Sequence, residues 1–283
     1  MKNKKRGKTL SKHNEHAITK KATTCKEKTI TMNNDYLIRL AKKYNTVDFI
    51  KDDPISFPHH YDNKKDIEIS SFIAQWIAYG KREMFLKILN NFFIEMPIPY
   101  LFIKDKEYEK YKNNHSNLYR FYTNHDFYLL CEKLHHIYFV LGQGKEDMEQ
   151  VILKNLITNK KDNQKKIEIE DVLKEIIRLF PQIKGIPQNL NSACKRLCLF
   201  LRWLVRKDGI VDFGIWNILE PKDLIIPVDV HVYKQALNLN LTQRKTADFK
   251  TAKEITNKLK TVFPDDVCLG DFALFGYGVN KNL

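Results

Sequence analysis

Residues 192–206 read SACKRLCLFLRWLVR, and this run gives the clearest indication of the class of fold. Its apolar side chains recur every three or four residues, which is the spacing of one buried helix face. The stripe contains Cys194, Leu197, Cys198, Leu201 and Val205. Ser192 is a suitable N-cap, and Gly209 follows shortly after the expected end of the helix. The pattern predicts a helix that runs from Ser192 to about Arg206.

The same periodicity appears in most of the chain from Asp35 onward. It predicts helices around 37–44, 69–76, 88–93, 126–141, 146–158, 168–180, 230–240, 249–263 and 267–276. The polar, Lys-rich segment 157–167 is expected to be a surface loop. Leu224–Val228 is strand-like but contains Pro227, and one short extended segment cannot form a sheet. The expected fold class is all-α.

The composition indicates a globular protein with an anionic partner. The chain has 283 residues, with 48 Lys or Arg against 34 Asp or Glu, which gives a formal charge of +14. This excess predicts binding to nucleic acid or to an acidic membrane surface. The hydrophobic content of 43% is enough for a core, and the presence of only 10 Gly and 9 Pro argues against a fold of many short strands. The length allows one large domain or two modest ones.

The N-terminal segment, residues 1–33, carries much of the charge. Ten basic residues there stand against Glu15 and Glu27, a net charge of +8 that leaves +6 for residues 34–283. The segment has almost no apolar periodicity, so it is expected to be a disordered basic arm that can bind phosphates. An alternative is that it has no role and that translation begins at Met32. Residues 34–283 are expected to form the helical core.

The chain shows no sign of membrane insertion, of a disulfide framework or of a metal site. No apolar run approaches the roughly 18 residues of a membrane span, and no apolar segment follows the basic N-terminus, so we expect a cytoplasmic protein. The cysteines at 25, 131, 194, 198 and 268 are odd in number, which favours reduced thiols. His59-His60 with Asp62, and His135-His136, lack the spacing of metal ligands. No metal and no cofactor is predicted.

Two segments could carry chemistry. On the 192–206 helix, Lys195, Arg202 and Arg206 fall along one face, which on most helices is simply a solvated basic face. The second segment is Ile226–Val232, which reads IPVDVHV. Asp229 in it is expected to cap a helix that begins at Val230, and a partly desolvated acid at a helix start also suits catalysis.

These segments resemble a known superfamily. Pro227–Val232, with Lys195 upstream on another helix, is similar to the V-D-x-H element of the helix-hairpin-helix DNA glycosylases. Further segments resemble a bacterial family of uncharacterised proteins within that superfamily: Asp53–His59, Ile77–Glu83, Ser192–Leu197, Phe200–Trp203 and Asp271–Gly276. The resemblance extends from about residue 35 to the C-terminus. The separation between Lys195 and Asp229 is closer to that of the archaeal 8-oxoguanine DNA glycosylases than to that of the common members.

The resemblance implies a two-lobed helical fold with a DNA-binding cleft between the lobes. The N-terminal and C-terminal helices would form one lobe, and roughly residues 115–230 the other. Lys195 would be the Schiff-base nucleophile, and Asp229 the acid that orients it and stabilises positive charge on the sugar. A lysine must be neutral to attack, which calls for desolvation or for neighbouring cations such as Arg196 and Arg202. The implied protein is a monomeric, nucleoid-associated DNA repair enzyme without an iron–sulfur cluster.

The resemblance also implies a pocket for a base flipped out of the duplex. Asp271 and Phe275 are four residues apart on one helix face, and they would accept hydrogen bonds from the base edge and stack on the base. An equally good interpretation of Phe275 is a core position. Arg202, Gln75 and Trp76 are further candidates for substrate binding.

One departure from the family leaves alternatives open. The Gly-rich hairpin L-P-G-x-G that usually precedes the lysine is absent, and its place is taken by Gly185–Asn191, in which Asn191 could supply the left-handed residue. The favoured hypothesis is a DNA N-glycosylase and abasic-site lyase acting on a damaged purine such as 8-oxoguanine. The alternatives are a non-catalytic DNA-binding protein on the same scaffold and a protein that acts on structured RNA.

Overall fold

The computed structural model describes residues 33–159 and 166–281, which all belong to one unit of the chain, Thr31–Leu283. The predicted basic arm lies outside the described residues except for Asn33, whose side chain caps the first helix by accepting a hydrogen bond from the N–H of Tyr36 at 3.1 Å. No helix within the described ranges combines the length and apolarity needed to cross a bilayer.

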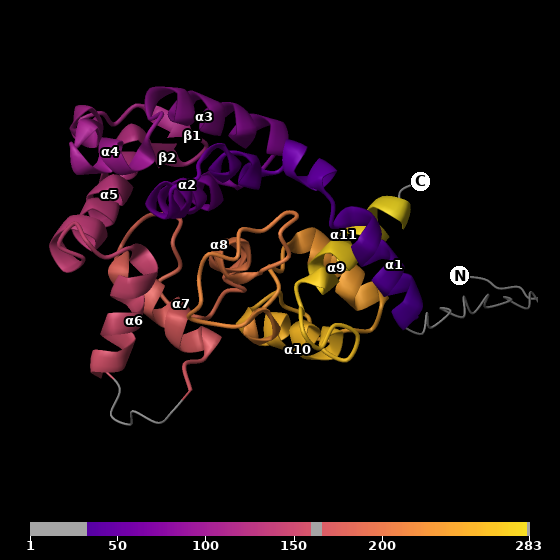
Figure 1. Cartoon of the computed structure of the whole chain (residues 1–283). Coiled ribbons are helices and arrows are strands. Elements are labelled where there is room, and N and C mark those ends of the chain that lie inside the picture. Colours follow the sequence, from indigo (N-terminus) through magenta and orange to yellow (C-terminus); the bar gives the residue numbers. More distant parts are fainter. Residues whose placement is uncertain (1–32, 160–165, 282–283) are drawn as a thin grey trace, which may run out of the picture. The chain divides into compact units, whose positions relative to one another are not determined.

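The described residues are mainly helical, which confirms the expected class (Figure 1). The α-helices are α1 (Asn34–Tyr44), α2 (Lys64–Ile77), α3 (Arg82–Glu95), α4 (Pro99–Lys104), α5 (Asn124–His135), α6 (Met148–Asn159), α7 (Ile169–Leu179), α8 (Lys195–Val205), α9 (Val230–Asn238), α10 (Phe249–Leu259) and α11 (Leu269–Lys281). Short 3₁₀ turns are η1 (Val47–Asp52), η2 (Pro54–Ser56), η3 (Pro58–His60), η4 (Glu107–Tyr111) and η6 (Pro221–Asp223). A π-helical turn, η5 (His136–Leu141), follows α5.

A small hairpin is the main difference from the expected fold. Strand β1 (Asn117–Tyr119) pairs antiparallel with β2 (Tyr122–Thr123). Leu224–Val228, the run that looked strand-like, belongs to neither a helix nor a strand and pairs with no strand within the described residues. Strands of two and three residues are too short to show the alternating pattern by which a strand is recognised in sequence.

Two observed helix ends also differ from those predicted. The helix expected over 126–141 ends as α5 at His135 and continues as the π-helical turn. In that turn Tyr138 donates a hydrogen bond from its hydroxyl to the buried carboxyl of Glu68 at 2.7 Å. The loop expected over 157–167 begins later, because α6 runs to Asn159. Residues 160–165 lie outside the described residues.

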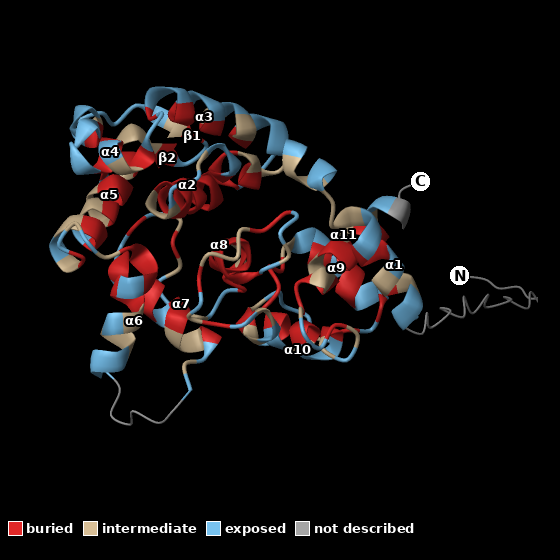
Figure 2. Cartoon of the chain, in the orientation of Figure 1, coloured by how far each residue is buried: buried red, intermediate tan, exposed pale blue. Residues whose placement is uncertain are grey.

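Helices α2 and α8 pack against each other in the core (Figure 2). Every residue of α2 from Asp66 to Ile77 is buried, and α8 is buried from Leu197 to Val205. A helix that is covered on all sides lies inside the protein rather than on its surface. Phe72 of α2 stacks on Phe180 at 4.2 Å and meets Phe200 of α8 edge-on at 5.1 Å. The packing of α2 against α8 therefore holds the residues at the ends of both helices in fixed positions.

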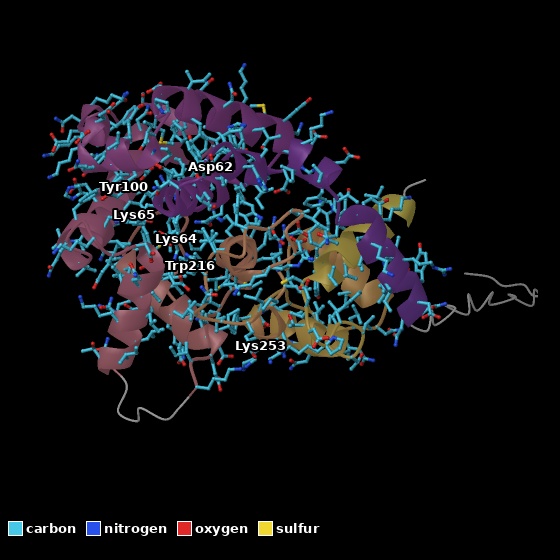
Figure 3. The ribbon with its side chains drawn as sticks, in the orientation of Figure 1. Asp62, Lys64, Lys65, Tyr100, Trp216 and Lys253 are labelled. Carbon is cyan, nitrogen blue, oxygen red and sulfur yellow. The ribbon has the colours of Figure 1, made fainter. Side chains whose placement is uncertain are left out.

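Polar contacts near the start of α2 join it to distant segments (Figure 3). Lys64 pairs with Glu149 of α6 at 2.6 Å, and the ammonium group of Lys65 lies 5.0 Å from the ring centre of Tyr100. Farther along α2, the indole N–H of Trp216 donates a hydrogen bond to Glu68 at 2.6 Å. These contacts fix α2 relative to α4, α6 and the segment that follows α8.

Candidate active site

An open cleft with a volume of about 930 Å³ lies where six segments of the chain meet. Its lining comes from the start of η2, the region between the end of α2 and the start of α3, Gly185–Pro187, the residues around the start of α8, the start of α9, and Ala247 before α10. The polar and charged members are Asp53, Gln75, Tyr79, Arg82, Ser192, Lys195, Arg196, Asp229 and His231. The cleft thus brings together Lys195 and Asp229, the two residues that the sequence singled out for catalysis.

Lys195 is the first residue of α8. The N-cap is Cys194 rather than the expected Ser192, and Cys194 is the left-handed residue of this turn, with φ of +50°. Asn191 does not adopt that conformation. Ser192 is held in place two residues earlier by a bridge to Asp248, and its hydroxyl accepts a hydrogen bond from the N–H of Cys194 at 3.4 Å. This turn aims the first side chain of the helix at the cleft.

Asp229 is the N-cap of α9, as predicted. One carboxylate oxygen, Oδ1, accepts a hydrogen bond from the N–H of Val232 at 2.7 Å, and the other, Oδ2, lies 3.3 Å from Nζ of Lys195. The side chains of Lys195 and Asp229 are 37% and 30% exposed, so both remain accessible from the cleft. A cap bond on one oxygen fixes the carboxylate while the other oxygen stays available to the amine.

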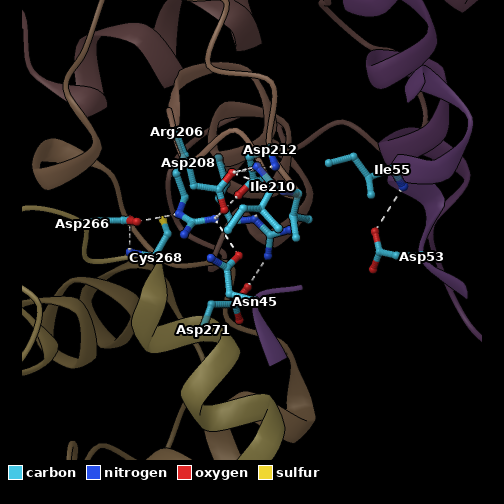
Figure 4. Close-up of polar contacts among 12 residues, drawn as sticks. Asn45, Asp53, Ile55, Arg206, Asp208, Ile210, Asp212, Asp266, Cys268 and Asp271 are labelled. Carbon is cyan, nitrogen blue, oxygen red and sulfur yellow. Dashed lines mark hydrogen bonds and ion pairs between the residues drawn. The ribbon is translucent and has the colours of Figure 1, made fainter. Parts of the chain in front are cut away.

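The basic helix face expected on α8 is not a solvated face (Figure 4). Arg202 and Arg206 are buried, and both pair with Asp212, at 3.2 and 2.8 Å. Arg206 also pairs with Asp208 at 2.6 Å and with Asp266 at 2.7 Å. These carboxylates offset the two guanidinium charges, so Lys195 is the cation of this face that reaches the cleft.

Arg196 has a structural role instead. Its guanidinium donates hydrogen bonds to the carbonyl of Trp76 at 2.6 Å, to the hydroxyl of Tyr122 at 2.7 Å and to the carbonyl of Gly185. It therefore ties the start of α8 to the end of α2 and to the hairpin. Trp76 is fully buried, and its indole N–H donates to the carbonyl of Lys184 at 2.7 Å.

The remaining candidates for substrate binding differ in whether they line the cleft. Gln75 lines the cleft, whereas the described lining does not include Trp76, Arg202, Asp271 or Phe275. Oδ2 of Asp271 accepts a hydrogen bond from Arg202 at 2.7 Å. The pKa of Asp271 is raised to about 6. Burial is the main cause, the nearby charge of Asp229 adds to the rise, and the charge of Arg202 opposes it. The ring of Phe275 is half-buried and packs edge-on against Tyr44 and Phe49, each at 5.5 Å.

Asp53 is a cleft residue whose role the sequence did not indicate. It caps η2 by accepting a hydrogen bond from the N–H of Ile55 at 3.1 Å. Burial raises the pKa of Asp53, and the charges of Arg202, Arg82 and Lys195 act against that rise. Its position directly before Pro54 was the available signal, because an acid at that position is a common cap of a turn that starts with proline.

The described residues do not gather three or more His, Cys, Asp or Glu side chains in a way that could hold a metal ion. The cysteines at 131, 194, 198 and 268 are buried free thiols. The arrangement at the cleft offers an amine beside a carboxylate, which suits covalent attack by the amine and electrostatic stabilisation by the acid.

Comparison with known proteins gives one match. A family model described as "Protein of unknown function (DUF2400)" matches residues 53–280, a range that contains the whole lining of the cleft. No curated protein and no solved structure matches the chain.

Proposed function

Because that family model spans most of the chain, the chain belongs to the family described as "Protein of unknown function (DUF2400)", and we propose that it is a DNA N-glycosylase with abasic-site lyase activity. The proposed substrate is a duplex that contains a damaged purine such as 8-oxoguanine. The observation that carries the proposal is the 3.3 Å approach of Lys195 Nζ to Asp229 Oδ2 at the edge of an open cleft.

The pair supplies what the reaction needs. After Nζ of Lys195 loses a proton, its lone pair attacks C1′ of the sugar as the bond to the base breaks, and the departing base takes the bonding electrons and a proton. The carboxylate of Asp229 stabilises the positive charge that develops on the sugar. The lone pair of the bound nitrogen then forms the C=N bond of a protonated imine as the bond between C1′ and the ring oxygen O4′ breaks and O4′ takes a proton. Loss of a proton from C2′ breaks the bond between C3′ and its oxygen, and the 3′-phosphate leaves with the bonding electrons.

The charge and the arrangement of the helices also support the proposal. The net charge of +14 favours binding to the phosphate backbone. The proposal includes a two-lobed fold in which the N-terminal and C-terminal helices form one lobe and roughly residues 115–230 the other, and the packing of α1 against α11 supports that part of it. The volume of the cleft is sufficient for a base extruded from the duplex.

Borohydride trapping tests the proposal. The full chain is expected to form a covalent adduct with duplexes that contain an abasic site or 8-oxoguanine, because borohydride reduces the imine to a stable amine. Lys195→Gln is expected to form none. Lys154→Gln serves as the matched control, because Lys154 is an exposed lysine that does not line the cleft. DNA binding without any Lys195-dependent adduct would instead be the behaviour of a non-catalytic binding protein.

Asp229→Asn separates catalysis from capping in the same assay. Asparagine caps helices about as well as aspartate, so the variant is expected to fold with a stability within about 1 kcal/mol of the wild type. Turnover is expected to fall by about 100-fold or more, since the charge beside Lys195 is lost. Asp248→Asn is the control, because Asp248 caps α10 in the same way outside the lining of the cleft. Equal turnover in the two variants would remove Asp229 from the mechanism.

A further inference from the structure

Lys195 and Asp229 leave one requirement of the proposed reaction unassigned, the proton that the base takes as it departs. A base that gains a proton leaves more readily, because the bonding electrons then end on a neutral molecule. Both oxygens of Asp229 are engaged, Oδ1 by the N–H of Val232 and Oδ2 by Nζ of Lys195. Asp229 therefore acts as an acceptor, and the proton must come from another group in the cleft.

Asp53 is a second carboxyl group of the cleft, and its Oδ1 accepts the hydrogen bond from the N–H of Ile55 at 3.1 Å (Figure 4). That bond fixes the side chain at the start of η2. Its other oxygen, Oδ2, forms no hydrogen bond or ion pair with the described residues. Asp53 is half-buried, and Oδ2 keeps contact with solvent. A molecule bound in the cleft can therefore reach Oδ2.

The surroundings of Asp53 favour its neutral form. Burial raises the pKa of Asp53, and the charges of Arg202, Arg82 and Lys195, with the hydrogen bond from Ile55, oppose the rise without cancelling it. The other charged or titratable side chains on the elements that pack against η2 are Asp48, Lys51 and Asp52 of η1, His59 and His60 of η3, and Lys64, Lys65, Asp66 and Glu68 of α2. A carboxyl group with a raised pKa keeps its proton to a higher pH, as a general acid must.

We propose that Asp53 is a further catalytic residue, the general acid that protonates the departing base. This inference rests on the proposed function. The bond between Oδ2 and its hydrogen breaks, its electrons stay on the carboxylate, and the proton joins a ring nitrogen of the base as the base takes the electrons of its bond to C1′. Solvent returns a proton to Asp53 before the next turnover. An abasic site has no base to release, so the attack of Lys195 on it does not require Asp53.

Base release and reaction with an abasic site are measured separately with the full chain, at saturating protein in excess over the duplex. The first duplex contains the purine that the wild type releases fastest from a panel of oxidised, alkylated and deaminated purines, and the second contains an abasic site. Asp53→Asn is expected to release the purine about 100-fold or more slowly than the wild type. It is expected to cleave the abasic duplex, and to be trapped on it by borohydride, at the wild-type rate. Asparagine keeps the cap of η2.

Asp52→Asn is the matched control. Asp52 is the exposed neighbour of Asp53, carries the same type of side chain and does not line the cleft. The variant is expected to react with both duplexes at wild-type rates. Unchanged base release in Asp53→Asn, or an equal loss on the two duplexes, would overturn the role of Asp53.

The pH dependence separates proton donation from a simple hydrogen bond to the base. The ratio of the base-release rate constants of wild type and Asp53→Asn is expected to fall as pH rises, because Asp53 loses the proton that it delivers. Lys195 titrates in both proteins, so its effect cancels in the ratio. A ratio that does not change with pH would show that Asp53 only binds the base, and the inference would be wrong.

The behaviour of the wild type distinguishes this inference from the proposed function. Trapping on the abasic duplex without release of any purine of the panel would overturn the role of Asp53 and leave lyase activity standing. Purine release without an adduct would count against lyase activity and leave the rate ratio to decide on Asp53. Neither activity in the wild type would overturn the proposed function and this inference with it.

Discussion

Glu68 is a fully buried carboxyl group held by three donors. It accepts hydrogen bonds from the hydroxyl of Tyr138, the N–H of Met148 and the indole of Trp216. Burial raises the pKa of Glu68 to about 7, and the charge of Asp147 adds to the rise, while the three hydrogen bonds oppose it. The group therefore titrates at a pH where an exposed glutamate is already ionised.

This raised pKa predicts a pH dependence of folding. Between pH 4.5 and 7 the unfolded chain releases the proton that native Glu68 still holds, so the free energy of unfolding falls as pH rises, by about 3 kcal/mol over the window. Urea unfolding at several pH values measures it. Glu68→Gln is expected to lose this component and to keep the contribution of Asp271, whose pKa is also raised. The same pH slope in Glu68→Gln and wild type would contradict the assignment.

At the level of elements, α8 is joined to the segment after it and to α11 by buried ion pairs. Asp212 pairs with both Arg202 and Arg206, and its side chain is completely buried. Asp271 at the start of α11 pairs with Arg202. Because a buried charge without a partner is costly, each carboxylate is needed to keep the arginines inside the protein.

Asp212→Ala is therefore expected to destabilise the protein by about 3–5 kcal/mol, since it leaves two guanidinium groups short of a counter-charge. Denaturant unfolding at neutral pH measures the loss. Lys154→Ala is the control, because it breaks the exposed pair with Glu146 and should cost at most about 1 kcal/mol. Similar losses in the two variants would show that the buried network does not hold α8 in place.

The same elements show which features of the fold could be predicted from the sequence. The apolar stripe of α8 and the cap at Asp229 are local patterns, and both were predicted from residues a few positions apart. Arg202 and Arg206 are held inside the protein by partners up to 161 residues away, so the helical period alone could not distinguish a buried face from a solvated one. The π-helical turn and the hairpin were missed because neither leaves a distinct period in the sequence.

Some of the residues that line the cleft were predicted from the sequence, and others were not. Lys195 and Asp229 each stand at a helix start, where sequence motifs are most informative, and the structure brings them together. Phe275 was ambiguous because a core aromatic and a stacking aromatic occupy the same helix position. Asp53 was missed as a cleft residue because its neighbours in space come from α3 and α8.

At the scale of the whole described unit, the first helix packs against the last. Leu37, Leu40 and Ala41 of α1 are buried, and α1 packs most extensively against α11. At Gly276 the two helices approach so closely that an added Cβ atom would overlap the ring of Tyr44. A residue with a side chain at this position would have to push the two helices apart.

Gly276→Ala is expected to lower the free energy of unfolding by about 1–3 kcal/mol through this overlap, although alanine favours a helix. Thermal or denaturant unfolding measures the change. Gly278→Ala is the matched control on the same helix, because the nearest atom to its added Cβ lies 3.3 Å away on the side chain of Gln235. It is expected to be about neutral. A Gly276→Ala protein as stable as Gly278→Ala would show that α1 adjusts without cost.

The contact between α1 and α11 also orders events during synthesis. Among the described helices the ribosome makes α1 first and α11 last, with more than two hundred residues between them. At a rate of about 5–20 residues per second, the apolar face of α1 waits roughly 10–50 s for α11 to emerge. During that interval the face is open to chaperones, and the nascent chain cannot complete this part of its core until α11 has been made.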